Sequence, residues 1–291
     1  MDKIAIKAAA KINLLLDICG CLENGYHKMD MIMQSIDLYD TVELKLGEPG
    51  IRMTCDDENL LCDESNICVR CAKAFYEYTK IQPQIDIYLQ KNVPMMAGLG
   101  GGSADGAAVL CGLNKLHKTN ISCITLCEIG FKIGADIPFC IMGGTQRVRG
   151  AGEVLSEVFP LNNDIFVLVA KPKFSVSTKL AFQSFDQEKN PPRADVNSMI
   201  LALERGFLSE IAANLSNVFE PFCKPQELNK IKNIMLKNGA EGALMSGSGS
   251  AVFALFENEK LALECAEILK NDMESVFVVK PLDKGIYAMC E

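Results

Sequence analysis

Short apolar runs and alternating apolar and polar positions dominate the first half of the chain. Four such segments predict β-strands: residues 3–9, 12–20, 31–46 and 84–89. The dipeptide Asn24-Gly25, between two of these segments, is a strong turn signal. Helical spacing predicts helices over residues 66–79 and 103–117, and Ser122 can cap a third helix that runs to about residue 132. The apolar run at 139–142 predicts a further strand.

The pattern changes near residue 160. Residues 165–170 predict a short buried strand, and helices are expected near 195–213 and 225–238. The tail then reads as strand, loop, strand, helix and strand, over 241–245, 246–250, 251–256, 258–270 and 275–280. This alternation predicts a second α+β layer structure. We therefore expect an α+β fold with two domains, 1–158 and 159–291.

A glycine-rich segment directly precedes the predicted helix at 103–117. It consists of Pro94, Met95, Met96, Ala97, Gly98, Leu99, Gly100, Gly101, Gly102, Ser103 and Ala104. Glycine adopts backbone angles that other residues avoid and lets a ligand approach the backbone closely. The unpaired N–H groups at a helix start, together with the helix dipole, form an anion site. The segment therefore predicts a phosphate-binding loop.

Other interpretations of this segment fit less well. No Lys-Ser or Lys-Thr closes a Gly-x-x-x-x-Gly frame, so the segment is not a Walker-type loop. Ser103 stands where a dinucleotide-binding motif needs its third glycine, and no Rossmann-like start lies near the N-terminus. A flexible linker is the remaining alternative, although Pro94 and the helix after Ser103 bound the segment closely.

Composition narrows the class of protein. The 29 basic and 37 acidic residues give a net charge of −8, which argues against a nucleic-acid partner. No apolar run reaches the roughly 20 residues of a membrane span, and charges interrupt the N-terminus, so neither a membrane anchor nor a secretory signal is expected. The 13 cysteines then indicate reduced thiols in a cytoplasmic protein. Cys68 and Cys71 have metal-like spacing but no matching second pair, so buried thiols are favoured over zinc.

Three further places could carry chemistry, and each has a purely structural alternative. Lys11 and Asn13 would share one face of a strand within an apolar run, or would lie on the solvated face of an edge strand. Asp136, in Gly134-Ala135-Asp136-Ile137-Pro138, is a catalytic carboxylate or a turn former. The small-residue segment 245–250 is a hairpin connection, or a second loop that approaches the same phosphates.

These motifs together resemble those of the GHMP small-molecule kinases. The glycine loop ending at Ser103 and the segment Met245-Ser246-Gly247-Ser248-Gly249 match the two hallmark motifs. Three more sets narrow the resemblance to the 4-diphosphocytidyl-2-C-methyl-D-erythritol kinases: Ala9-Ala10-Lys11-Ile12-Asn13-Leu14 with Gly25-Tyr26-His27, Gly134 to Pro138, and Gly150-Ala151-Gly152-Glu153. The motifs keep their order and spacing from about residue 8 to residue 256.

The resemblance implies a two-domain GHMP kinase fold with the active site in the cleft between the domains. It implies ATP-dependent phosphorylation of the 2-hydroxyl of 4-diphosphocytidyl-2-C-methyl-D-erythritol, a step of the non-mevalonate (MEP) route to isoprenoid precursors. By position, Lys11 and Asp136 match the catalytic pair. The loop from Pro94 to Ala104 would hold the ATP phosphates, with Ser103 near the phosphates and Mg²⁺. The protein ligands of the metal are not assigned.

The substrate residues also follow from the resemblance. Tyr26 and His27 match the positions that recognise cytosine, although both are also plausible turn residues after Asn24-Gly25. The remaining positions expected to bind substrate are Asn13, Thr178, Phe182, Gly247 and Ser248. One departure from the family pattern is Asn217-Val218-Phe219-Glu220-Pro221, where the family often has Asn-Asp-Leu-Glu-Pro.

The alternative functions that we consider belong to proteins with the same fold. They are a kinase for homoserine, mevalonate or a sugar, a catalytically silent sensor, and a decarboxylase that uses ATP to activate a leaving group. The pair Tyr26 and His27 favours the cytidine substrate, and the presence of both Lys11 and Asp136 argues against a silent sensor. A monomer or weak homodimer is expected, with small molecules as its partners.

Overall fold

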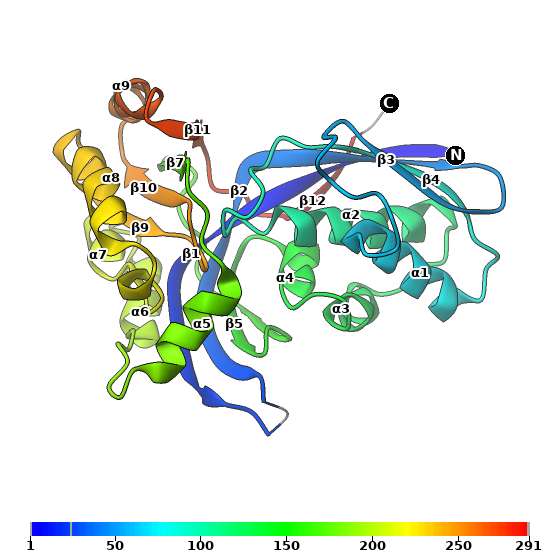
Figure 1. The fold of residues 1–291 in the computed structure, drawn as a ribbon, viewed down its shortest axis with the longest axis horizontal. Helices are drawn as coiled ribbons and strands as arrows, with labels where there is room; N and C mark the ends of the chain where they lie inside the picture. Colours follow the sequence, from blue (N-terminus) through cyan, green and yellow to red (C-terminus); the bar gives the residue numbers. More distant parts are fainter. Residues whose placement is uncertain (1, 24, 290–291) are drawn as a thin grey trace.

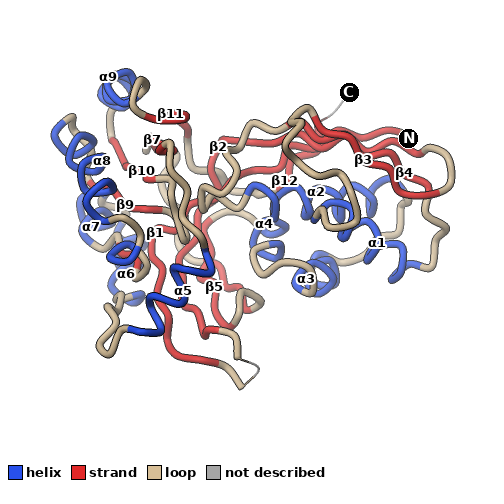
Figure 2. Tube along the Cα trace, in the orientation of Figure 1, coloured by secondary structure: helices blue, strands red, loops and turns tan. Residues whose placement is uncertain are grey.

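Two β-sheets and the helices packed against them make up the computed structural model, which describes residues 2–23 and 25–289 (Figures 1 and 2). Within those residues the larger sheet has eight strands, with β12-β1-β2-β4-β3 as its main path. Strand β5 also pairs with β2, β6 pairs with β5, and β8 pairs with β1. The smaller sheet has four strands in the order β11-β7-β10-β9.

Two long antiparallel strands, β1 (Lys3–Cys21) and β2 (His27–Leu46), run through the molecule (Figure 1). The predicted strands 3–9 and 12–20 are one continuous strand, because a bulge between Ala9 and Lys11 shifts the alternation without ending the pairing. Of the predicted Asn24-Gly25 turn, Asn24 lies outside the described residues, whereas Gly25 has a φ of 82°.

The other strands of the large sheet are short. They are β3 (Gly50–Cys55), β4 (Gln84–Gln90), β5 (Thr145–Gly150), β6 (Val154–Glu157), β8 (Ser216–Asn217) and β12 (Ile286–Met289). The sequence pattern predicts β4 but misses the others, since they carry few apolar residues or lie at sheet edges. Strand β12 pairs with β1, so the end of the chain returns to the first sheet. The division at residues 158 and 159 stays a prediction.

Four helices cover one face of the large sheet: α1 (Ile67–Thr79), α2 (Gly101–Leu116), α3 (Cys123–Phe131) and α4 (Ile137–Met142) (Figure 2). Ser122 caps α3 by accepting a hydrogen bond from the Thr125 N–H at 3.1 Å, as predicted. The predicted strand at 139–142 is wrong, because those residues belong to α4. A four-residue apolar run does not distinguish strand from helix, and Pro138 fits the first turn of a helix.

The large sheet with α1 to α4 forms a first lobe, and the smaller sheet is the centre of a second lobe. Its strands are β7 (Phe166–Pro172), β9 (Gly242–Met245), β10 (Val252–Phe256) and β11 (Met273–Val279). Around it lie α5 (Thr178–Gln187), α6 (Val196–Arg205), α7 (Leu208–Ala213), the 3₁₀ helix η1 (Glu220–Phe222), α8 (Pro225–Lys237) and α9 (Glu259–Leu269). The central strands β7 and β10 are buried on both faces, which explains their uninterrupted apolar sequences. Among the described residues, no helix is long and apolar enough to span a bilayer.

Candidate active site

The glycine loop of the first lobe and the segment Ser246–Gly249 of the second lobe are in direct contact. The Ser246 hydroxyl donates to the Gly98 carbonyl at 3.0 Å, and the Ala251 N–H donates to the Ala97 carbonyl at 3.0 Å. Gly98 has a φ of 76°, and a Cβ on it would lie 2.1 Å from the Ser246 carbonyl oxygen. Only glycine fits here, because a side chain would meet the backbone of the opposite loop.

Lys11 lies under both loops. Its N–H donates to the Leu99 carbonyl at 2.9 Å, and a Cβ on Gly100 would lie 2.9 Å from its side-chain Cγ. The ammonium Nζ donates to Asn13 Oδ1 at 2.6 Å and lies 3.8 Å from Asp136 Oδ2. The Lys11 side chain is only 5% exposed, whereas that of Asp136 is 34% exposed. A buried cation therefore faces a carboxylate that a ligand can reach.

Asn13 connects this pair to the second lobe. Its backbone N–H donates to the Ser246 hydroxyl at 3.3 Å, the same hydroxyl that donates to Gly98. Asp136 stands just before α4, so the short helix that the sequence pattern missed also places the carboxylate. Lys11, Asn13 and Asp136 are thus brought together from a strand and a loop more than a hundred residues apart.

A cavity of about 710 Å³ opens at this point. The predicted residues that line it are Lys11, Asn13, Met96, Gly98, Gly100, Ser103, Asp136, Thr178, Phe182, Gly247 and Ser248. The Thr178 and Ser248 hydroxyls lie 2.7 Å apart, which ties the start of α5 to the second loop. A second hollow, of about 350 Å³, is lined by Pro94 to Ser103 together with Asn66, Lys91 and Asp105. The glycine loop therefore borders both spaces.

Tyr26 and His27 do not line this cavity, but His27 adjoins its wall. The His27 ring packs against Phe182 at an interplanar angle of 31° with centroids 4.5 Å apart, and its Nε2 lies 2.7 Å from Asp186 Oδ1. Tyr26 is 63% exposed. The structure thus places His27 next to Phe182, a cavity residue predicted from a distant part of the sequence.

The sequence reasoning missed two residues that shape the site. Asn217 is buried, and its Nδ2 donates to the carbonyls of Met245 and Gly247, each at 2.8 Å, which holds the second loop in place. Phe219 lines the cavity and packs edge-on against Phe182, with centroids 4.7 Å apart. Both lie in the segment 217–221, whose local sequence pattern does not indicate these contacts.

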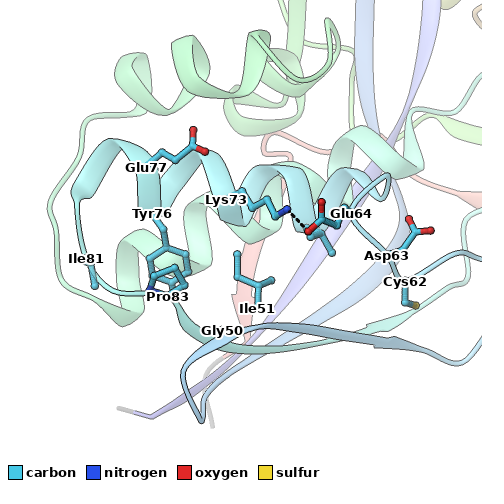
Figure 3. A pocket seen from close by; sticks show the side chains of 11 residues that line it. Gly50, Ile51, Cys62, Asp63, Glu64, Lys73, Tyr76, Glu77, Ile81 and Pro83 are labelled. Carbon is cyan, nitrogen blue, oxygen red and sulfur yellow. Dashed lines mark ion pairs between the residues drawn. The ribbon is translucent and has the colours of Figure 1, made fainter.

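A separate hollow of about 610 Å³ lies between α1 and β3 (Figure 3). Lys73 reaches across its rim to Glu64, with Nζ and Oε1 2.7 Å apart. Asp63 and Glu77 add negative charge to the lining of the hollow. Because the only lysine of this lining is paired and the carboxylates outnumber it, the hollow does not suit a phosphate ligand.

Two cysteines of the first lobe belong to its core: Cys71 is buried, and Cys111 is partly buried against the same core. Burial raises the pKa of Cys71 to about 12, and burial likewise raises the pKa of Cys111 to about 12. Both side chains therefore stay as thiols at neutral pH and act as small apolar groups in the core.

Each of the two lobes matches a known protein family. Residues 66–144 match the GHMP kinases N terminal domain, and residues 199–275 match the GHMP kinases C terminal family. A homoserine kinase structure from Cytophaga hutchinsonii has a TM-score of 0.80 at 21% identity, covering 99% of this chain and 98% of that one. A crystal structure of 4-(cytidine 5'-diphospho)-2C-methyl-D-erythritol kinase has a TM-score of 0.78 at 30% identity, covering 95% and 98%.

Fold and site together define an ATP-dependent small-molecule kinase of the GHMP class. Sequence relatives narrow the class further. A 4-diphosphocytidyl-2-C-methyl-D-erythritol kinase of Clostridium acetobutylicum is 40% identical over 277 residues, covering 94% of this chain and 99% of the relative. That of Caldicellulosiruptor bescii is 43% identical over 278 residues, covering 94% and 96%. The chain belongs to the 4-diphosphocytidyl-2-C-methyl-D-erythritol kinase family.

Replacing Gly98 by alanine tests the contact between the two loops. Gly206, at the end of α6, is a matched control, since its φ of 75° is nearly the same but nothing lies within 4 Å of its Cβ position. Both substitutions carry the strain of a left-handed alanine, about 1–2 kcal/mol. Only Gly98→Ala should also separate the loops, raise the KM for ATP about tenfold or more and lower the melting temperature beyond the control. Equal effects of the two substitutions on KM and melting temperature would show that the contact is unimportant.

Proposed function

We propose that this chain transfers the γ-phosphoryl group of ATP to the 2-hydroxyl of 4-diphosphocytidyl-2-C-methyl-D-erythritol, in the MEP route to isoprenoid precursors. The observation that carries the proposal is the pair Lys11 and Asp136, with Nζ 3.8 Å from Oδ2, at the junction of two glycine-containing loops. The relatives that share about 40% of the sequence carry this substrate in their names.

The glycine loop is proposed to hold the ATP phosphates. Gly100 caps α2 in a left-handed conformation, so the N–H groups of the first turn are left without side-chain partners. These donors and the positive end of the helix dipole favour an anion. The Ser246–Gly249 loop faces the same place from the second lobe, so the transferred phosphoryl group would lie between the two loops.

Asp136 is proposed as the general base. Its carboxylate is accessible from the cavity and accepts the proton of the substrate hydroxyl as the new O–P bond forms. The bond between the γ-phosphorus and the β,γ-bridging oxygen breaks at the same time, and ADP leaves with that oxygen. Lys11, held by Asn13, keeps the Asp136 carboxylate oriented and offsets the negative charge on the phosphoryl group.

Mg²⁺ is proposed to accompany ATP. Among the described residues there is no group of three His, Cys, Asp or Glu side chains that could hold a metal ion. The ion would therefore be held mainly by the nucleotide phosphates, with the Ser103 hydroxyl nearby at the start of α2. When bound, it neutralises charge on the triphosphate.

The aromatic cluster beside the cavity is proposed to bind the cytosine ring. Tyr26 provides an exposed ring face, and the Phe182 ring lines the cavity. In the neutral tautomer that donates its Nε2–H to Asp186, His27 has a lone pair on Nδ1 that can accept from the exocyclic amino group of cytosine. Asn13, Thr178, Gly247 and Ser248 would bind the polar remainder of the substrate.

Several broader features belong to the same proposal. The two domains would be residues 1–158 and 159–291, with the substrate cavity between them, and the protein would act in the cytoplasm as a monomer or weak homodimer. The homoserine kinase likeness, at 21% identity, concerns the fold alone. A silent sensor is disfavoured because Lys11 and Asp136 are both present and adjacent.

The substrate assignment is tested by measuring ADP release with Mg-ATP and three acceptors. We expect turnover with 4-diphosphocytidyl-2-C-methyl-D-erythritol to exceed that with homoserine or mevalonate by about a hundredfold or more in kcat/KM, because the alternatives lack the base that the aromatic cluster binds. Equal or faster turnover with homoserine or mevalonate would overturn the assignment.

Replacing Asp136 by asparagine tests the general base. The amide keeps the shape but cannot accept the proton, so kcat should fall about 10²- to 10⁴-fold while the KM for ATP changes little. Asp164→Asn, on an exposed loop of the second lobe, is the matched control and should keep full turnover. If Asp136→Asn retains wild-type kcat, the base lies elsewhere.

Replacing Tyr26 by alanine tests the cytosine site. A stacked ring contributes about 0.5–1.5 kcal/mol, so the KM for the cytidine substrate should rise about three- to tenfold while kcat stays within about twofold. Tyr78→Ala, which removes another exposed ring from α1, should change neither constant. A loss confined to kcat would contradict a purely binding role for Tyr26.

A further inference from the structure

A buried ion cluster lies at the base of the glycine loop. Lys91 follows directly after β4, and its Nζ lies 2.5 Å from Asp40 Oδ2 and 2.9 Å from Asp105 Oδ2. Asp105 lies in α2, the helix that follows the loop. The three side chains are 0–7% exposed. Lys91 therefore joins the chain segment that enters the loop to the helix that leaves it.

Asp40 fixes the same segment through its other carboxylate oxygen. Oδ1 accepts hydrogen bonds from the Asn92 N–H at 2.6 Å and from the Val93 N–H at 2.8 Å. Because Asp40 belongs to β2, a central strand of the large sheet, it anchors the loop entry to that sheet. One carboxylate thus holds two backbone groups and the ammonium of Lys91.

We propose that Asp40 is a positioning residue for the kinase reaction: through Lys91 and Asp105 it sets the glycine loop in the conformation that binds ATP. This inference rests on the proposed function. Asp40 lines neither the 710 Å³ cavity nor the 350 Å³ hollow, so it acts on the nucleotide only through the loop. Lys91 and Asp105, in contrast, both line the smaller hollow.

The start of α2 rests directly on this cluster. A Cβ on Gly101 would lie 3.0 Å from Val93 Cγ1 and 3.3 Å from Asp40 Oδ2, so the first turn of the helix sits against the segment that Asp40 holds. A shift of Asp40 or Val93 would therefore move the N–H groups of the first turn. Those groups bind an anion only while they converge on it, and small displacements reduce binding and rate steeply.

Electrostatics explains why the cluster holds its geometry. Burial disfavours the ammonium form of Lys91, but Asp105 and Asp40 outweigh it and raise the pKa of Lys91 well above its usual value. Buried charges persist only when they are paired, and here Lys91 pairs with two carboxyl groups, of which burial and the nearby Asp40 raise the pKa of Asp105 well above its usual value. The loop ends are therefore held more firmly than surface ion pairs would hold them.

The test compares Asp40→Asn with Asp86→Asn in the full chain. The amide introduced by Asp40→Asn would keep the shape and one oxygen for the backbone N–H groups, but it turns an N–H donor toward the Lys91 ammonium. Asp86, on β4, forms an exposed pair with Arg52 at 2.5 Å and provides the same substitution in the same sheet, away from the loop. We measure kcat, the KM for each substrate, and the Kd of a non-hydrolysable ATP analogue by calorimetry.

For Asp40→Asn we expect the KM for ATP and the Kd of the analogue to rise about tenfold or more, with the KM for the cytidine substrate within about twofold. Asp86→Asn should match the wild type. Asp40→Glu keeps the charge but moves the carboxylate by one methylene, and it replaces Asp40→Asn in the test if that variant does not fold. It should raise the KM for ATP and the Kd of the analogue about threefold or more.

The positioning role is overturned if a folded Asp40 variant binds ATP and its analogue within twofold of the wild type. It is also overturned if the constants for both substrates rise equally, because that pattern indicates general disorder of the enzyme. Failure of the proposed function would look different: the wild type itself would not phosphorylate the cytidine substrate, while analogue binding would still report on Asp40.

Discussion

The proposed active site is centred on one hydroxyl group. Ser246 donates to the Gly98 carbonyl and accepts from the Asn13 N–H, so it joins the glycine loop, the strand that carries Lys11 and the second lobe at a single point. The lack of side chains at Gly98 and Gly247 is what allows the loops to meet there. Lys11 fills the space beneath them and presents its ammonium to Asp136. Neither loop would form a site for phosphoryl transfer without the other.

Much of this arrangement could be predicted from local sequence. The glycine loop is identifiable because its glycines allow close approach of a ligand or a backbone, and because Pro94 and the start of a helix bound it. The alternation of β2 and the apolar runs of β7 and β10 likewise predict their strands. The sequence pattern singled out Lys11 and Asp136 as candidates, and the resemblance to a known family predicted that they form a catalytic pair. The structure places them close together, and their catalytic roles are proposals.

The features of the structure that could not be predicted from local sequence depend on contacts between distant parts of the chain. Residues 139–142 form a helix rather than a strand, because tertiary packing decides the conformation of so short an apolar run. Asn217 gave no local sign that it holds the carbonyls of Met245 and Gly247. The Asp40, Lys91 and Asp105 cluster is also invisible to periodicity, since its members come from β2, the end of β4 and α2. Such buried polar groups are identified only by their partners.

The two loops, Lys11 and Asp136 are proposed to form one site that phosphorylates an alcohol of a cytidine diphosphate substrate. Phosphorus-31 magnetic resonance of the reaction products distinguishes this transfer from hydrolysis of ATP. We expect a new phosphate monoester signal that grows with ADP, while the diphosphate signals of the substrate remain and free phosphate stays at background. Release of ADP and free phosphate without a new monoester would contradict it.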